Sequence, residues 1–296
     1  GPIDMIMNFI RGFCMALADS VPGVSGGTIA FLLGFYDKFI DSLDHIMGKD
    51  KKKRKEAILF LCKIAGGWII GMAGSVLVLA SLFEKHIYQI SSMFLGLILF
   101  SIPLIISEEK KTIKGNYRHL FFLVIGVALV VVISCLNPVA GEGISVDAGS
   151  LNIGLGAYVF IAGMIAICAM VLPGISGSTI LLVFGLYIPI ITSLKEILHL
   201  NMEYLPVLII FGLGVLTGIA LVIRAIKTSL KKYRSQMIYL IIGMMIGSLY
   251  AIKVGPTTLE VPRDQLTLST FSIVFFIIGA ILVLGLQKLQ MVGEEK

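Results

Sequence analysis

The sequence predicts an all-α polytopic membrane protein built from an inverted-topology repeat, and three observations support this prediction. Of its 296 residues, 57% are hydrophobic and 14% are charged, and the mean hydropathy is +0.98. Soluble domains carry about 25% charged residues, so this chain has too little polar surface for a soluble globule, a disordered chain or a fibrous repeat. The other two observations are a series of long apolar segments and a glycine-rich motif that occurs twice.

Apolar segments and their breaks define the predicted elements, because a helix needs about 20 residues to cross the hydrocarbon core. Each half of the chain has three unbroken spans and one apolar stretch broken by Pro, Gly and Ser, which we interpret as a re-entrant helical hairpin. Irregular backbone is tolerated at membrane depth only inside protein or beside a cavity, so the hairpin tips should be buried. The first repeat is predicted at 3–136, with a hairpin at 5–47 and spans at 57–83, 88–107 and 119–136. An extracytoplasmic connector follows at 137–153. The second repeat is predicted at 154–290, with a hairpin at 154–198 and spans at 204–226, 236–253 and 269–288.

Positive charge alternates between the connecting loops and orients the chain, since Lys and Arg gather in the cytoplasmic loops of membrane proteins. The rich loops carry six, four and five of these residues, at 48–56, 108–118 and 224–235. The loops between them carry at most one each, at 84–90, 137–153, 195–204 and 254–268. We therefore expect the basic loops and the C-terminus in the cytoplasm, with the two hairpins entering from opposite faces.

The second half of the sequence repeats the first. Ala18–Leu43 matches Ala169–Leu194 without gaps at an offset of 151 residues. Because each half holds a hairpin and three spans, the odd number of crossings inverts the second half relative to the first. Inverted repeats with discontinuous helices are typical of transporters, whose substrate site lies where the breaks meet. GxxxG pairs, which predict close helix packing, occur at Gly67/Gly71, Gly214/Gly218 and Gly243/Gly247.

The two broken segments are suited to an anion. After each break a new helix starts, with its first amides unpaired and the positive end of its dipole at that point. Ser25 or Thr28 can cap the first of these helices, and glycine lets the backbone approach a ligand closely. The alternative is a tight turn that binds nothing. The predicted cradle residues are Pro22, Gly23, Ser25, Gly26, Gly27 and Thr28 at the first break and Pro173, Gly174, Ser176, Gly177, Ser178 and Thr179 at the second.

Three ionisable residues lie in apolar surroundings, where a charge is costly and usually functional. Arg11 can recognise phosphate bidentately and Lys63 is a second candidate cation, although both can instead snorkel to the membrane surface. Asp19 lies next to the first break, and its repeat partner is Met170, so its role is not symmetric. We hypothesise that Asp19 carries or gates a proton.

Other functional classes fit the sequence less well. Residues 23–27 match GxSxG, but the serine-hydrolase elbow needs a preceding strand and a histidine base, and the four histidines fall at predicted segment ends. A nucleic-acid partner is not expected, because the basic residues lie in loops between apolar segments. There is neither a CxxC pair nor metal-ligand spacing, so no metal or other cofactor is expected. A carrier for a small soluble anion, an enzyme acting on a lipid phosphate and a packing scaffold remain alternatives.

The motif ADSVPGVSGGTIAFLLGFYDKFIDSL, with its second copy LPGISGSTILLVFGLY, resembles the bacterial membrane family catalogued as domain of unknown function 368, which includes the PopT-type polyprenyl-phosphate transporters. The resemblance covers essentially the whole chain. It implies re-entrant helices and a multi-pass protein of the bacterial plasma membrane, a transporter and not an enzyme, that returns undecaprenyl phosphate from the outer to the inner leaflet. The residues alone indicate only an anion. The sequence leaves the coupling ion and a homodimer open.

Overall fold

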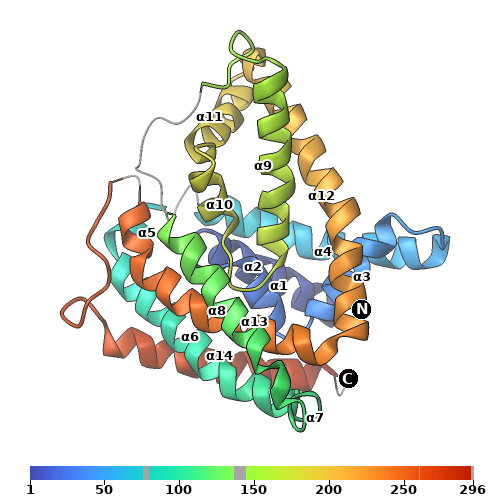
Figure 1. Ribbon diagram of the computed structural model, residues 1–296, viewed down its shortest axis with the longest axis vertical. Helices are drawn as coiled ribbons and strands as arrows, with labels where there is room; N and C mark the ends of the chain where they lie inside the picture. Colours follow the sequence, from blue (N-terminus) through green and yellow to red (C-terminus); the bar gives the residue numbers. More distant parts are fainter. Residues whose placement is uncertain (76–79, 137–144, 260, 295–296) are drawn as a thin grey trace.

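The computed structural model describes residues 1–75, 80–136, 145–259 and 261–294, and every regular element in these ranges is a helix (Figure 1). The first half holds α1 (Pro2–Asp19), α2 (Gly26–Leu32), α3 (Tyr36–Ile46), α4 (Lys51–Gly74), α5 (Ala80–Lys85), α6 (Ile87–Glu108), α7 (Lys110–Ile113), the 3₁₀ turn η2 (Tyr117–His119) and α8 (Leu120–Cys135). The second half holds α9 (Ile153–Val171), α10 (Gly177–Val183), α11 (Tyr187–Leu198), η3 (Met202–Tyr204), α12 (Leu205–Lys232), α13 (Arg234–Val254), η4 (Gly255–Thr258) and α14 (Ile273–Glu294). Part of the predicted connector, 137–144, lies outside the described residues.

Six candidate membrane spans among the described residues confirm the predicted all-α, multi-pass class. They are Lys51–Gly74, Ile87–Glu108, Tyr117–Cys135, Ile153–Val171, Met202–Lys232 and Arg234–Thr258. Five of them coincide with predicted spans. The sixth is α9, which was predicted as the first leg of a hairpin and is itself long enough to cross. The predicted span at 269–288 corresponds to α14, whose described apolar part, Ile273–Lys288, is shorter than a full span.

Three predicted boundaries, the start of α4, the end of α12 and the start of α14, differ from the structure. α4 begins inside the basic run because the Asp50 carboxylate accepts hydrogen bonds from the amides of the first turn, at 3.0 and 3.2 Å. Residues 76–79 of the predicted span at 57–83 lie outside the described residues, and its last residues belong to α5. α12 continues to Lys232, so most of the predicted basic loop at 224–235 is helix. α14 begins at Ile273 because the preceding residues form a turn in which the Phe271 amide donates to the Thr267 carbonyl.

Each hairpin also bends a second time, which the sequence analysis did not predict. Instead of one helical run to residue 46, α2 ends at Leu32 and α3 starts at Tyr36, with Gly34 between them at φ +76°. In the second half Gly185 takes φ +72°, and α10 and α11 are bent by 108° relative to each other. A left-handed backbone conformation favours glycine. The recurrence of these two glycines at the repeat offset was therefore a signal for the bend.

Glycines bring four pairs of helices into close contact: α1 with α4, α9 with α12, α6 with α14 and α8 with α13. A Cβ on Gly67 would overlap the carbonyl oxygen of Phe9, and a Cβ on Gly214 would overlap that of Phe160. Phe9 and Phe160 are themselves repeat partners, so the same contact occurs in both halves. The prediction that the GxxxG glycines pack helices closely is confirmed.

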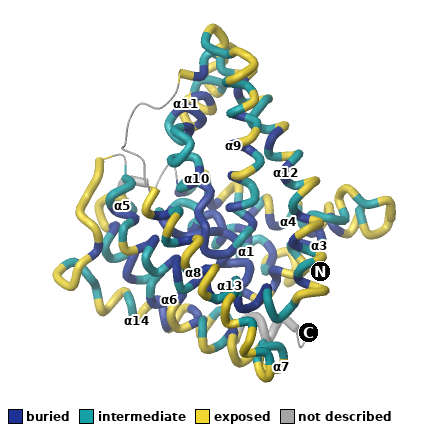
Figure 2. Tube along the Cα trace, in the orientation of Figure 1, coloured by how far each residue is buried: buried dark blue, intermediate teal, exposed yellow. Residues whose placement is uncertain are grey.

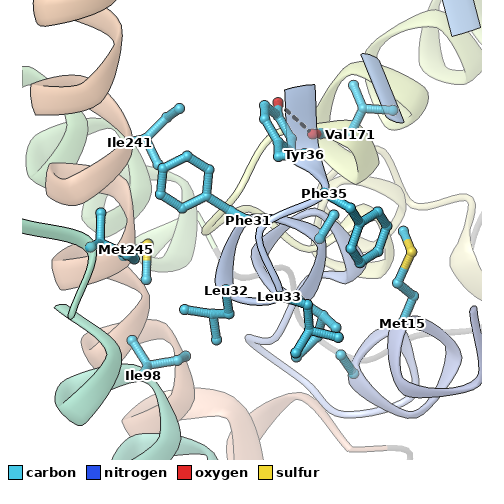
Figure 3. Packing of buried hydrophobic residues seen from close by; sticks show 14 of the residues in the cluster. Met15, Phe31, Leu32, Leu33, Phe35, Tyr36, Ile98, Val171, Ile241 and Met245 are labelled. Atoms are coloured by element: carbon cyan, nitrogen blue, oxygen red, sulfur yellow. Dashed lines mark hydrogen bonds between the residues drawn. The ribbon is translucent and has the colours of Figure 1, made fainter. Parts of the chain in front are cut away.

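α13 lies at the centre of the helices. In the most apolar stretch of this helix 67% of the residues are buried, against 17% to 44% in the other candidate spans. Figure 2 shows the buried trace concentrated in the middle of the molecule, with exposed stretches on the outer helices and at the helix ends. In Figure 3, Phe31 of α2 points toward Ile241 and Met245 of α13. The segment that follows the first break is thus packed against the central helix.

Gly67→Ala tests the close contact between α1 and α4. We expect it to lower the free energy of unfolding by about 1–3 kcal/mol, the range for overpacking, because the new methyl group meets backbone that cannot yield. The measurement is thermal unfolding of the detergent-purified protein. Gly66→Ala is the matched control, since a Cβ there meets nothing within 4 Å. Equal unfolding temperatures for the two variants would contradict the contact.

Candidate functional site

The two broken segments meet and are joined by hydrogen bonds. We name residues 20–28 tip one and residues 171–179 tip two. The Ser25 hydroxyl donates to the Leu172 carbonyl at 3.2 Å, and the Gly174 amide donates to the Thr28 hydroxyl oxygen at 2.8 Å. Just beyond tip one, the Tyr36 hydroxyl donates to the carbonyl of Val171 at 2.8 Å (Figure 3). The structure therefore brings the predicted cradle residues of the two halves together.

Both tips also press against α13, and glycine is needed for this. Gly23 and Gly174, which follow the two tip prolines, have φ +85° and +88°. A Cβ on Gly23 would lie 2.7 Å from the backbone of Ala251, and a Cβ on Gly174 would lie 2.5 Å from the carbonyl oxygen of Met244. A side chain at either position would thus be strained by the backbone conformation and blocked by α13.

Tip one has its first helical amides paired within the protein. Of the two predicted cap residues, Ser25 is the N-cap of α2, and its side chain accepts a hydrogen bond from the Gly27 amide at 3.1 Å. The Gly26 amide donates to Asp19 Oδ1 at 2.8 Å, and Trp68 Nε1 donates to Asp19 Oδ2 at 3.0 Å. The prediction of unpaired amides is therefore wrong for tip one. The carboxylate of Asp19 occupies the place that an anionic ligand would take.

Tip two differs at the corresponding position. Met170 replaces the aspartate, and its side chain is the nearest neighbour of a Cβ built on Gly177. Ser176 is at the N-cap position of α10, but its hydroxyl is hydrogen-bonded to the Ser178 hydroxyl at 2.7 Å and caps no amide. Within the described parts of the chain, the amides of Gly177 and Ser178 make no hydrogen bond. Tip two thus retains the unpaired amides that the sequence predicts.

A small cavity adjoins tip two. Its volume is about 10 Å³, which is room for about one water molecule and too little for a phosphate group. It is lined by Gly23, Val130, Ile133, Ser134, Gly174, Ile175, Ser176, Thr179 and Ala251. Ser178 and Thr179 are half-buried, whereas residues 23–28 of tip one are fully buried. A ligand at this place therefore requires the tips to move apart.

The structure places Arg11 about midway along α1 and pairs Lys63 with the first turn of that helix. Arg11 precedes Asp19 by roughly 12 Å along the helix axis. Its guanidinium donates to Asn8 Oδ1 at 2.9 Å and lies 4.9 Å from the centre of the Phe35 ring. Lys63 forms an ion pair of 2.8 Å with Asp4, in the first turn of α1. These two predicted site residues therefore lie in a different region from the cradle.

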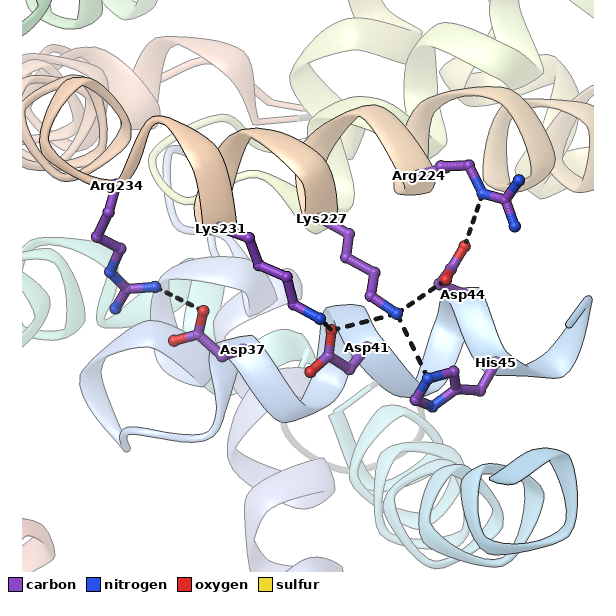
Figure 4. A network of polar contacts seen from close by, with 8 residues as sticks. All are labelled: Asp37, Asp41, Asp44, His45, Arg224, Lys227, Lys231 and Arg234. Carbon is purple, nitrogen blue, oxygen red and sulfur yellow. Dashed lines mark hydrogen bonds and ion pairs between the residues drawn. The ribbon is translucent and has the colours of Figure 1, made fainter. Parts of the chain in front are cut away.

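A second polar feature was missed by the sequence analysis. Figure 4 shows acidic side chains of α3 facing basic side chains of α12 and the start of α13. The ion pairs join Asp37 to Arg234 at 2.6 Å, Asp41 to Lys231 at 3.7 Å and to Lys227 at 3.6 Å, and Asp44 to Lys227 at 3.0 Å and to Arg224 at 3.5 Å. We name this set of residues the charge ladder. It ties the first hairpin to a helix of the other half.

The innermost pair of the charge ladder is Asp44 with Lys227, whose side chains are 14% and 17% exposed. Burial by itself would raise the pKa of Asp44, but the Lys227 hydrogen bond and the charges of Lys227 and Arg224 hold that pKa below its usual value. The spacing of Asp37, Asp41 and Asp44 places all three carboxylates on one helix face. That spacing was the signal in the sequence for an acidic helix face. The lysines of the run at 224–235 had been interpreted only as charges of a cytoplasmic loop.

The fold and the site together define a class of protein. Discontinuous helices that meet inside a bundle of candidate membrane spans are typical of membrane transporters.

Comparison with known proteins then identifies the family. Residues 15–270 match the model of the VCA0040-like family, described as undecaprenyl phosphate translocase-like, and the chain belongs to this family. A protein named polyprenyl-phosphate transporter from Staphylococcus aureus is 34% identical over 97% of this chain and 98% of its own length. A protein of the same name from Vibrio cholerae is 31% identical over 97% of each chain. No solved structure gives a significant match.

Thr28→Val tests the contact between the tips. The substitution keeps the shape of the side chain but leaves the buried Gly174 amide without an acceptor, which costs about 1–3 kcal/mol. We expect a lower unfolding temperature for the detergent-purified variant. Thr217→Val is the control, because that exposed hydroxyl bonds only to a carbonyl of its own helix. The same small change in both variants would show that the inter-tip hydrogen bond contributes nothing.

Proposed function

We propose that this protein is a translocase that moves undecaprenyl phosphate from the outer to the inner leaflet of the bacterial plasma membrane, without a cofactor and without catalysing a reaction. The family and the names of the two relatives support a polyprenyl-phosphate substrate. The observation that carries the proposal is the meeting of the two tips, which places polar backbone where an anionic head group needs it.

The proposed arrangement in the membrane is an inverted repeat with two re-entrant hairpins. The matching contacts of α1 with α4 and of α9 with α12 support two equivalent halves. The alternation of basic and charge-poor loops supports opposite orientations, with the basic loops and the C-terminus in the cytoplasm. Under this arrangement the charge ladder lies at the cytoplasmic side, since it includes residues of the basic run at 224–235.

The tips would replace water around the phosphate. An isolated ionised group costs tens of kcal/mol in a medium of low dielectric constant, so the head needs a polar path while its prenyl tail stays in lipid. The unpaired amides of tip two, with the hydroxyls of Ser176, Ser178 and Thr179, form one side of that path. Tip one can form the other side once the Asp19 carboxylate releases the Gly26 amide.

Arg11 and Lys63 would act outside the cradle. Arg11 lies roughly 12 Å before Asp19 along α1, and Lys63 pairs with Asp4 in the first turn, so we propose that they attract the phosphate on the cytoplasmic side of the tips. Arg11 suits this role because its guanidinium can bind two phosphate oxygens.

The charge ladder would close the cytoplasmic side in the conformation seen here. α3 packs on α4 and on α12, across the two halves. Its repeat equivalent, α11, packs on α12 and η3, and the described residues show no comparable contact between α11 and α5, the segment equivalent to the end of α12. We propose that separation of this contact opens the cytoplasmic side in an alternating-access cycle.

Transport by the purified protein in liposomes tests this function. We expect the wild-type protein to move a short-chain polyprenyl phosphate between leaflets, and Thr179→Val to slow the movement because the site loses a hydroxyl beside tip two. The measurement is the loss of accessible lipid phosphate from the outer leaflet. Thr217→Val, whose hydroxyl donates to the Leu213 carbonyl of its own helix α12, should leave the rate unchanged. Transport of inorganic phosphate but not of the lipid would instead support a carrier for small anions, and release of phosphate from the lipid would support an enzyme.

Asp19→Asn tests whether a proton accompanies the head group. Inward movement of one negative charge against an inside-negative potential costs about 2.3 kcal/mol per 100 mV, and a bound proton would offset this. Protonated Asp19 would also release the Gly26 amide for the phosphate. We expect wild-type transport to rise as the external pH falls and the variant to lose this dependence. Asp147→Asn, in the connector, is the control, and unchanged pH dependence in Asp19→Asn would remove Asp19 from the mechanism.

A further inference from the structure

An open groove lies at the end of α13 that is remote from the charge ladder. Its volume is about 720 Å³, within the range of small-molecule sites. It is lined by Leu95 of α6, Leu249 and Lys253 of α13, and Gln265, Leu266, Thr267, Leu268, Ser269 and Phe271 of the segment before α14. Arg234 of the ladder and Lys253 lie roughly 29 Å apart along the axis of α13, so the groove and the ladder are at opposite ends of the central helix.

The segment that forms one wall of the groove is held in place by specific bonds. Its Leu266 amide donates to the Lys253 carbonyl at 2.9 Å, and its Asp264 carbonyl accepts from the Tyr88 hydroxyl at 2.8 Å. Arg263 donates to the Glu84 carbonyl at 2.9 Å and lies 4.6 Å from the centre of the Tyr88 ring. The groove is thus a built feature of the fold and not a gap beside a loose loop.

The lining of the groove combines a long apolar surface with one cation. Leucine side chains and Phe271 form the apolar part, and Leu268 is 97% exposed although the segment that carries it is fixed. Lys253 is exposed and lines the groove. No carboxylate of the described residues forms an ion pair with it. Gln265, Thr267 and Ser269 add small hydrogen-bonding groups. This pattern is complementary to a molecule with a compact anionic head and an apolar tail.

The groove adjoins the tips without being continuous with them. Ala251 contacts Gly23 of tip one and lines the small cavity beside tip two. At about 100° per residue, Ala251 points roughly 200° away from Leu249 and Lys253 on the same turns of α13. A head group bound at Lys253 is therefore separated from the tips by the end of a single helix.

We propose that this groove is the loading site for a prenyl-chain lipid monophosphate, with the phosphate at Lys253 and the start of the tail along Leu95, Leu249 and Phe271. The proposal rests on the proposed function, which places this end of α13 toward the outer leaflet where the lipid is collected. Substrate binds here while the charge ladder closes the other side, and it reaches the tips when they separate.

Binding of a short-chain prenyl phosphate to the full-length protein in detergent tests the groove. We expect Lys253→Gln to weaken binding about tenfold or more, the loss of one charge-assisted hydrogen bond, and Lys253→Arg to bind like the wild type. Lys195→Gln, at the end of α11 and outside the groove, is the control for loss of a lysine. A photoreactive prenyl phosphate on the wild-type protein should label the segment 261–271, which gives a readout that needs no variant to fold.

The outcomes separate this inference from the proposed function. Wild-type affinity in Lys253→Gln, labelling elsewhere, or equally strong competition by phosphatidylglycerol would overturn the loading site. If the lipid is still transported in those cases, the proposed function stands. Failure of the wild-type protein to bind or transport any prenyl phosphate would instead overturn the proposed function, and the loading site with it.

Discussion

The structure depends on how the backbone amides and carbonyls at the two helix breaks find hydrogen-bond partners in apolar surroundings. A helix that stops inside a membrane protein leaves amides and carbonyls that no water can reach, and each unpaired group costs several kcal/mol. Here the two breaks pair with each other. The Leu172 and Val171 carbonyls at the end of α9 accept from Ser25 and Tyr36, and the Gly174 amide donates to Thr28. The tips are therefore adjacent because neither could be buried alone.

The helix-packing contacts recur in the two halves of the chain, whereas the polar contacts differ between them. Close contacts at glycine recur in both halves, because two backbones can approach closely only where a Cβ is absent. The polar groups break this symmetry. Asp19 pairs the first amide of α2, whereas Met170 leaves the start of α10 unpaired. The carboxylates of α3 face a basic helix, but in the second half the repeat partner of Asp37 is the apolar Ile188. The two halves are therefore not interchangeable in their polar contacts.

α13 connects all of these features. Its first residue, Arg234, belongs to the charge ladder, its middle contacts Gly174 through Met244, and its end contacts Gly23 through Ala251 and lines the groove at Lys253. It is also the most buried of the candidate spans. A packed helix moves as a rigid body, so displacement of α13 would act on the ladder, both tips and the groove together.

The sequence by itself determined the membrane class, the family, the repeat and the Pro-Gly breaks, because these follow from composition, from hydropathy over long segments and from motifs that recur at a constant offset. It also limited the cap of α2 to Ser25 or Thr28, since capping acts over two or three residues. Only the tertiary structure decided which groups meet across the chain. Asp19 rather than a ligand pairs with Gly26, Arg11 and Lys63 lie away from the tips, and the basic run at 224–235 is a helix paired with α3. These contacts join residues far apart in sequence, and no local pattern specifies such a pairing before the helices pack.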